Sequence, residues 1–461
     1  MKYMSKNYFI LFTFAELTFI EMNKNILRLA IPNIISNITV PLLSMVDMSI
    51  VGHLSLDVYI GAIATVSIIF NFMYWSFSFL RMGTSGFTAQ AYGAENNKEM
   101  ATILLRSLLI AFVAGLLIIL FQNIIFDVAF KVIKASSDVR LYAGNYFHIY
   151  VWAAPAVLGM YAFSGWFVGM QDARTPMYIA IAVNIINISL SLVFVYVLNM
   201  NIEGVALGST IAQIMGFLIA FIIWYFKYKV VRINIDFHRL KNVAAFIPFF
   251  RVNTDIFLRT MLLIIVTTFF TSSSAKMGNI TLAANALLMQ MFTLFSYIMD
   301  GFAYSAEALT GRYIGAKRHD VLKTLVKRLF AWGALLAVFF TVMYGLFTDE
   351  ILQLLTNKTD VIAACKEYQI WVLLIPIAGF SAFLWDGIFI GATASKQMRN
   401  SMFVAAACFF AIYYSLYDNW GNNALWFAFI VYLGMRGIMQ AFLYRKISAS
   451  FNQNLQEEPC S

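Results

Sequence analysis

Charged residues are scarce in this sequence: only 12% of its 461 residues are Asp, Glu, Lys or Arg, whereas soluble proteins carry about a quarter. The charges are also clustered, which leaves apolar runs of roughly 20 residues or more, long enough to cross about 30 Å of hydrocarbon. Backbone polar groups cannot stay unpaired in lipid, so these runs must be helices, and the pattern does not fit the short alternating strands of an outer-membrane barrel. The lack of charge therefore indicates an all-α integral membrane protein.

Cysteine and histidine are equally sparse. Three cysteines form no spaced set, so neither a disulfide framework nor a metal site is expected, and no cofactor is implied: Cys365, Cys408 and Cys460. Four scattered histidines and the absence of a nucleophile motif give an intramembrane enzyme little support: His53, His148, His238 and His319. The chain also lacks a phosphate-binding GxxxxGK[ST] loop and room for a large soluble domain. If the protein moves a solute uphill, the energy must then come from an ion gradient or a partner protein.

What the chain has is a series of long apolar segments. We expect twelve spans, at 27–52, 58–82, 101–126, 141–169, 176–199, 203–226, 244–273, 280–308, 324–347, 361–391, 398–417 and 423–444. If both termini are cytoplasmic, 22 of the 32 Lys and Arg lie on the cytoplasmic side and six lie outside. This asymmetry supports the span count and the orientation. The net charge of +9 then reflects basic cytoplasmic loops, and a nucleic-acid partner is not expected.

The two halves of the sequence repeat each other with an offset of 222 residues. Thr88 and the segment Tyr92-Gly93-Ala94 are matched by Thr310 and Ile314-Gly315-Ala316, and Phe167-Val168-Gly169 is matched by Phe389-Ile390-Gly391. Six spans in each half return the chain to its starting side, so the repeats are parallel. We therefore predict two six-helix lobes related by a pseudo-two-fold axis along the membrane normal. The expected divisions are an extension (1–25), an N-lobe (26–226), a cytoplasmic loop (227–243), a C-lobe (244–446) and a tail (447–461).

Insertion of an ionisable side chain deep into a membrane costs free energy, so such residues usually have a function. Asp47 is the strongest candidate, because it lies in an apolar span with Pro41 ahead of it and with no Lys or Arg within a helical turn or two. A lone carboxylate on a helix that bends easily has the parts of a proton or sodium switch. The fifth span offers neutral oxygen ligands on one helical face, and the sixth adds another: Asn184, Asn187, Ser191 and Ser209. These polar residues fit a coupling-ion site or interhelical hydrogen bonding equally well.

The second half carries its own set of buried charges. Asp300, Tyr304 and Glu307 share a face of the eighth span, and Asp386 lies in the tenth. These acids could line a cavity for a cationic substrate or pair with Arg259, Arg399 or Arg436, and we favour pairing for at least one. Arg251, Asp255 and Arg259 follow at i, i+4 and i+8, which predicts a structural ladder of ion pairs. Among the many aromatic residues, Tyr74 and Trp75 are our candidates for a pocket.

The sequence resembles the multidrug and toxic compound extrusion (MATE) family, in particular its DinF-like branch, from about Ile26 to Arg445. The resemblance rests on four stretches with characteristic motifs, at 42–54 (VDMSIVGH), 79–94 (LRMGTSGFTAQAYGA), 299–316 (DGFAYSAEALTGR) and 385–402 (DGIFIGAT). It implies two lobes around a cleft, alternating access, and export of small organic, often cationic compounds in exchange for protons or sodium. We expect a multi-pass monomer in the bacterial inner membrane.

The resemblance also implies roles for individual residues. The first-helix aspartate that couples the ion corresponds to Asp47, and the fifth-helix asparagine to Asn187. Ser191 stands where an acidic residue is often found, and Ser209 stands where the family has a threonine. Because the second carboxylate is missing, we prefer H⁺ over Na⁺ as the coupling ion. The alternative function is a flippase for lipid or lipid-linked oligosaccharide, which should have several free basic residues in its cavity, whereas the deep arginines here are few.

Overall fold

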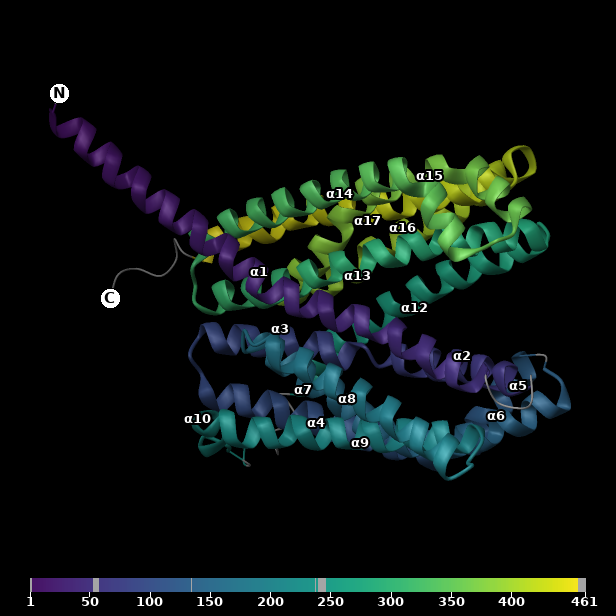
Figure 1. Cartoon of the computed structure of the whole chain (residues 1–461). Coiled ribbons are helices and arrows are strands. Elements are labelled where there is room, and N and C mark those ends of the chain that lie inside the picture. The colour runs from purple at the N-terminus through teal and green to yellow at the C-terminus, as the bar shows by residue number, and fades with distance from the viewer. Residues whose placement is uncertain (1, 53–57, 134, 237, 239–245, 455–461) are drawn as a thin grey trace. The chain divides into compact units, whose positions relative to one another are not determined.

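The computed structural model describes residues 2–52, 58–133, 135–236, 238 and 246–454, and nearly all of this part is helical (Figure 1). Eleven segments within it are long and apolar enough to cross a membrane, and each coincides with one predicted span from 58–82 onwards. The first predicted span, 27–52, lies inside the continuous helix α1 (Lys2–Gly52), which also includes residues 2–25 of the expected extension. The predicted all-helical membrane fold is confirmed.

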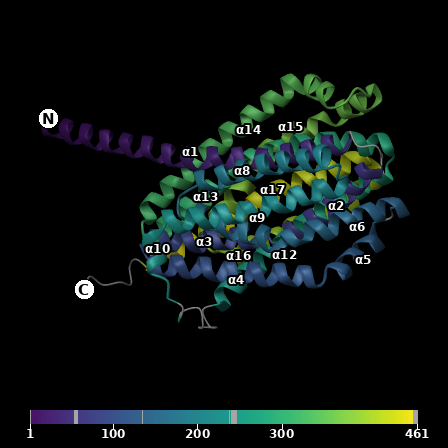
Figure 2. The same cartoon turned by 60° about the horizontal axis from the view of Figure 1, so that its bottom comes forward.

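Two compact units make up the chain. The first consists of Met1–Ile34 and Leu262–Ser461, and the second of Ile35–Met261. The second unit contains the later part of α1, followed by α2 (Val58–Ser76), α3 (Phe79–Gly93), α4 (Asn97–Leu120), α5 (Gln122–Val132), α6 (Ser137–Tyr150), α7 (Ala154–Gly169), α8 (Arg174–Leu192), α9 (Ile202–Lys227) and α10 (Lys229–Ile233). Helix α5 follows the end of α4, and the chain then returns through α6 (Figure 2).

The first unit contains the start of α1 and the later part of α12 (Phe246–Lys276). They are followed by α13 (Asn279–Gly315), α14 (His319–Leu355), α15 (Thr359–Gly391), α16 (Ser395–Trp420) and α17 (Asn422–Asn454). Helix α14 is interrupted at Phe347, whose backbone is not helical. These long helices are the second half of the predicted repeat.

Helices α1 and α12 each belong partly to one unit and partly to the other. The boundary lies after Ile34 in α1 and after Met261 in α12. The start of α1 packs in the first unit, where the Ser305 hydroxyl donates to the carbonyl oxygen of Ile26 at 2.9 Å. The start of α12 packs in the second unit, where the ring of Phe249 stacks on Phe87 with 5.6 Å between centroids. The two helices that open the sequence repeats therefore each begin in the unit formed mainly by the other half.

The 222-residue repeat is visible in the backbone. Three turns in each half contain a residue with positive φ, and these residues occupy equivalent positions: Glu95 with Lys317, Gln171 with Thr393, and Asn199 with Gly421. In each case the residue follows the end of a helix, where a left-handed residue allows the chain to leave the helix. The two halves thus share their turns as well as their spans.

Two helix crossings repeat with the same offset. A Cβ atom on Gly165 would lie 2.2 Å from the carbonyl oxygen of Arg81, and one on Gly387 would lie 2.1 Å from that of Ala303. Such distances are too short for any side chain, so glycine is needed where α7 crosses α3 and where α15 crosses α13. Small residues allow this close approach of helices in membranes.

Candidate functional site

Asp47 lies near the end of α1, where Ile50 and Val51 are buried in the apolar core of the second unit. Its Oδ1 atom is buried and has no hydrogen-bond partner among the described residues. A buried acceptor without a partner costs about 1–3 kcal/mol, and more when it is charged. Asp47 is therefore suited to receive a proton or a cation.

The polar face predicted on α8 is present and connects α1 to α9. Asn184 donates through Nδ2 to the carbonyl oxygen of Thr39 at 3.1 Å, two residues before Pro41. Asn187 donates through Nδ2 to the Ser209 hydroxyl at 2.8 Å. This face therefore contacts the backbone of α1 at Thr39, just before Pro41, and contacts α9 at Ser209.

Two further oxygen atoms on this face lack partners within the part of the chain that the structure describes. They are Oδ1 of Asn187 and Oγ of Ser191, and the two residues are 3% and 0% exposed. The Ser191 hydroxyl is pressed against α9, because a Cβ atom on Gly208 would lie 2.7 Å from it. Neutral amide and hydroxyl oxygens are ligands that hard cations accept. The chemistry of this face thus fits a small cation or a hydrogen-bond donor.

A cluster of tyrosines on α6 and α2 borders this region, and the sequence reasoning missed most of it. Asp47 lies within electrostatic range of Tyr146 and Tyr150, and Tyr146 hydrogen-bonds to Ser209. The rings of Tyr146 and Tyr150 are 5.9 Å apart, and Tyr74 stacks edge-on to Tyr150 at 6.3 Å. The sequence signal for this cluster is that Tyr146 and Tyr150 are four residues apart and therefore share one face of α6. The structure therefore links Asp47 to Ser209 through Tyr146.

Tyr74 and Trp75 differ in their surroundings although they are neighbours in the chain. Tyr74 is buried, and its hydroxyl has no partner among the residues described. Trp75 exposes 54% of its surface. Only Tyr74 therefore belongs to the tyrosine cluster.

The acidic residues predicted in the second half lie in the first unit, apart in sequence from the Asp47 region. Asp386 on α15 forms a buried ion pair with Arg436 on α17, with 2.7 Å between Oδ2 and Nη2. The other carboxylate oxygen accepts from Nε2 of Gln440 at 2.6 Å. The expected pairing of at least one of these acids is therefore present, and Arg436 is the partner.

The remaining candidates are placed but not joined into one site. Glu307 is 1% exposed, whereas Asp300 and Tyr304 are half-buried on the same helix α13. Asp255 and Arg259 are buried on α12, whereas Arg251 is exposed. The substrate role of the first three residues and the ion-pair ladder of the others stay predictions.

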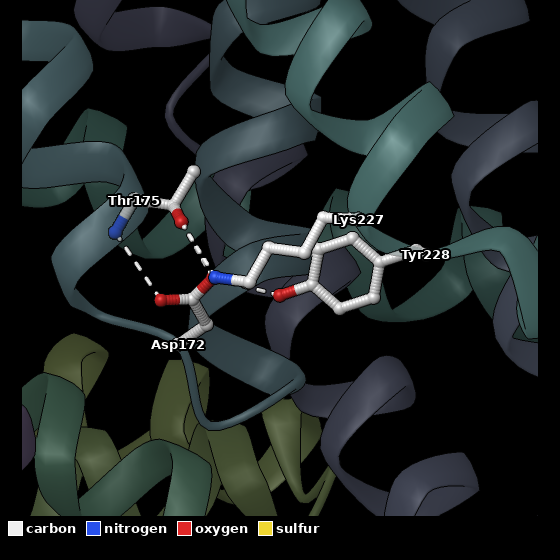
Figure 3. A network of polar contacts seen from close by, with 4 residues as sticks. All are labelled: Asp172, Thr175, Lys227 and Tyr228. Carbon is white, nitrogen blue, oxygen red and sulfur yellow. Dashed lines mark hydrogen bonds and ion pairs between the residues drawn. The ribbon is translucent and has the colours of Figure 1, made fainter.

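A polar cluster joins the turn after α7 to the end of α9 (Figure 3). Oδ2 of Asp172 accepts from Lys227 Nζ at 2.7 Å, from the Tyr228 hydroxyl at 2.7 Å and from Oγ1 of Thr175 at 2.6 Å. Burial raises the pKa of Asp172, but these hydrogen bonds outweigh burial and hold the pKa below its usual value. Burial and the neighbouring carboxylate raise the pKa of Tyr228. The cluster was not predicted, since Lys227 is distant in sequence from Asp172.

Asp172→Asn should lower the free energy of unfolding by about 1–2 kcal/mol, because the charged acceptor of three side-chain hydrogen bonds is lost. The folded-state pKa of Asp172 is depressed, so its stabilisation is present above the unfolded-state value and is lost only in acid. The difference in melting temperature between variant and wild type should thus be equal at pH 5.5 and pH 8. A difference that shrinks at pH 5.5 would show that Asp172 titrates in this range.

Comparison with known proteins places the chain in a family. The MatE family model matches it twice, over residues 32–193 and 256–415, once in each half. The DNA damage-inducible protein F of Escherichia coli (strain K12) is 37% identical over 92% of this chain and 92% of its own length. A crystal structure of MATE in the bent conformation superposes with a TM-score of 0.85 at 18% identity, over 94% of this chain and 97% of that one.

A second solved structure has the same fold. It is the outward-facing conformation of a multidrug resistance MATE family transporter of the MOP superfamily, with a TM-score of 0.81 at 18% identity, over 94% of this chain and 97% of that one. The double match of the family model agrees with the internal repeat, and the identity to the Escherichia coli protein extends over nearly the whole chain. This chain belongs to the MatE family of multi-pass membrane transporters.

Proposed function

We propose that the protein is a secondary active efflux transporter that exports small organic, cationic compounds in exchange for protons. The observation that carries the proposal is the half-buried Asp47, whose Oδ1 atom is shielded from solvent and lacks a partner among the described residues. A relative with a matching name, the multidrug and toxin extrusion protein 1 of Danio rerio, supports organic compounds as the cargo, and the cationic charge is our own proposal. We place the protein in the inner membrane, as a monomer with both termini in the cytoplasm.

Protonation of Asp47 provides the coupling step in this proposal. The neutral carboxyl group changes the interactions of α1 with Tyr146 and Tyr150, which lie within electrostatic range. Pro41 lowers the resistance of α1 to bending, since it removes one helical hydrogen bond. Asn184 holds the backbone of α1 at Thr39, so a change in α1 reaches α8 directly. A proton from outside would thereby reshape the second unit and release substrate.

The proposal can be tested in proteoliposomes with a fluorescent organic cation and with proton and sodium gradients imposed separately. Transport driven by the proton gradient alone is the expected result. Transport driven only by sodium would keep the antiporter and change the ion. No transport under either gradient would contradict the proposal, and lipid-linked substrates would then be tried as cargo for a flippase.

Ser191→Asp should make the transport rate depend on sodium, whereas we expect wild-type transport to be coupled to protons. Ser191 is fully buried on the same face of α8 as Asn187, so a carboxylate there would add a second negative charge to the oxygen ligands. The measurement is the initial transport rate at constant pH with and without sodium, with Ser191→Asn as a neutral control of similar size. An unchanged ion preference in a folded Ser191→Asp variant would argue against the role of the missing carboxylate.

A further inference from the structure

We propose that Arg436 is a built-in counter-ion that occupies the carboxylate of Asp386 and thereby prevents this acid from binding a transported cation. Arg436 would then be a specificity-determining residue of the first unit. The inference rests on the proposed function, because it concerns which acids are available to cations during transport.

The geometry around Asp386 leaves both carboxylate oxygens engaged. Nη2 of Arg436 is 2.7 Å from Oδ2, and Nε2 of Gln440 is 2.6 Å from Oδ1. Arg436 and Gln440 lie four residues apart on α17, so that one helical face presents both donors. The guanidinium of Arg436 also lies over the rings of Phe383 and Tyr432, at 5.9 Å and 5.5 Å. The arginine thus makes the contacts of carboxylate and aromatic rings that an organic cation would seek.

All three polar side chains are shielded from solvent. Asp386 is 6% exposed, Arg436 is 3% exposed and Gln440 is 1% exposed. Buried ion pairs are weak contributors to stability, since desolvation of both charges offsets their attraction, and apolar replacements are often neutral or better. Stability alone therefore gives a poor account of this pair. Control of the charge on Asp386 gives a better one.

The pair belongs to one half of the repeat only. At the offset of 222 residues, Asp386 corresponds to Ser164 and Arg436 to Ile214. The glycine crossing next to Asp386 does recur, at Gly165 and Gly387. A residue pair required by the shared helix packing should recur with that crossing. The ion pair instead belongs to a task of the first unit alone.

A second carboxylate lies near Arg436. Asp300 on α13 lies within electrostatic range of Arg436, in addition to Asp386 and Tyr432. One arginine thus stands near two carboxylates in the first unit. Removal of its charge would leave negative charge beside the rings of Phe383 and Tyr432, and carboxylates and aromatic rings are the groups that attract an organic cation.

The test is binding of tetraphenylphosphonium to the purified full-length protein by equilibrium dialysis, without any gradient. Arg436→Gln should raise the affinity by at least about tenfold, because a buried carboxylate that has lost its counter-ion is free to pair with the bound cation. The double variant Asp386→Asn/Arg436→Gln should return the affinity to the wild-type value. Arg140→Gln is the matched control, since it removes an arginine from the exposed pair with Asp127 and should leave the affinity unchanged.

Unchanged affinity in a folded Arg436→Gln variant would overturn the proposal, and so would equal enhancement in the double variant. If Arg436→Gln does not fold, Arg436→Met takes its place with the same expected rise in affinity, because it also removes the charge and keeps a long side chain in the gap, and unchanged affinity in that folded variant would overturn the proposal. The proposal requires that the double variant bind the probe as wild type does, and weaker binding by the folded protein would overturn it. The readout is independent of coupling: the enhancement should persist in an Asp47→Asn background, and it can be measured even if wild type shows no gradient-driven transport.

Discussion

Asp47→Asn should reduce transport of an organic cation under a proton gradient to the rate seen without any gradient. The variant carries a neutral amide of the same size, so it resembles the protonated acid and cannot release or take up a proton. Because the coupling ion acts only through a difference between two charge states, a side chain with one state cannot couple. The measurement is the initial rate in proteoliposomes, with wild type prepared in parallel.

Folding should survive this substitution. The Oδ1 atom of Asp47 has no hydrogen-bond partner among the described residues, so the neutral amide breaks no hydrogen bond at this atom and avoids the cost of a charge in the membrane. Asp138→Asn is the matched control, because Asp138 is an exposed aspartate at the start of α6 in the same unit. Gradient-driven transport retained by Asp47→Asn, at a rate similar to that of Asp138→Asn, would exclude Asp47 as the coupling residue.

The sequence was sufficient to predict the helices and their duplication. Apolar length alone set the spans, and the matched Gly169 and Gly391 disclosed the offset that the turns and crossings of the structure repeat. The polar face of α8 was also predictable, since residues three and four apart on a helix are neighbours. These features depend on local spacing, which one sequence displays directly.

Features that depend on distant contacts were not predictable in the same way. The sequence left three arginines as partners for the buried acids, and only the packing of α15 on α17 selects Arg436 for Asp386. The Asp172 cluster was missed because helices α8 and α9 separate Asp172 from Lys227 in the sequence. The division of α1 and α12 between two units was missed because composition does not change at Ile34 or Met261.

The second large effect is expected at the repeated helix crossing. Gly165→Ala and Gly387→Ala would each place a methyl group against a backbone carbonyl, at 2.2 Å from Arg81 and 2.1 Å from Ala303. A helix backbone cannot yield as a flexible side chain can, so the two helices must separate, at a cost at the upper end of about 1–3 kcal/mol. The melting temperature of the purified protein should fall by roughly 3–6 °C in each variant.

Gly434→Ala on α17 separates this crossing effect from the general effect of replacing glycine. A Cβ atom on Gly434 would meet no atom within 4 Å, so alanine there should be neutral or stabilising by about 0.5–1 kcal/mol, since it stiffens the unfolded chain. Equal melting temperatures for Gly387→Ala and Gly434→Ala would contradict the tight crossing of α15 and α13. A loss at Gly387 without a similar loss at Gly165 would show that only one half needs it. Similar losses at both positions would mean that the duplicated helix crossing, unlike the buried charges, is a requirement that both halves share.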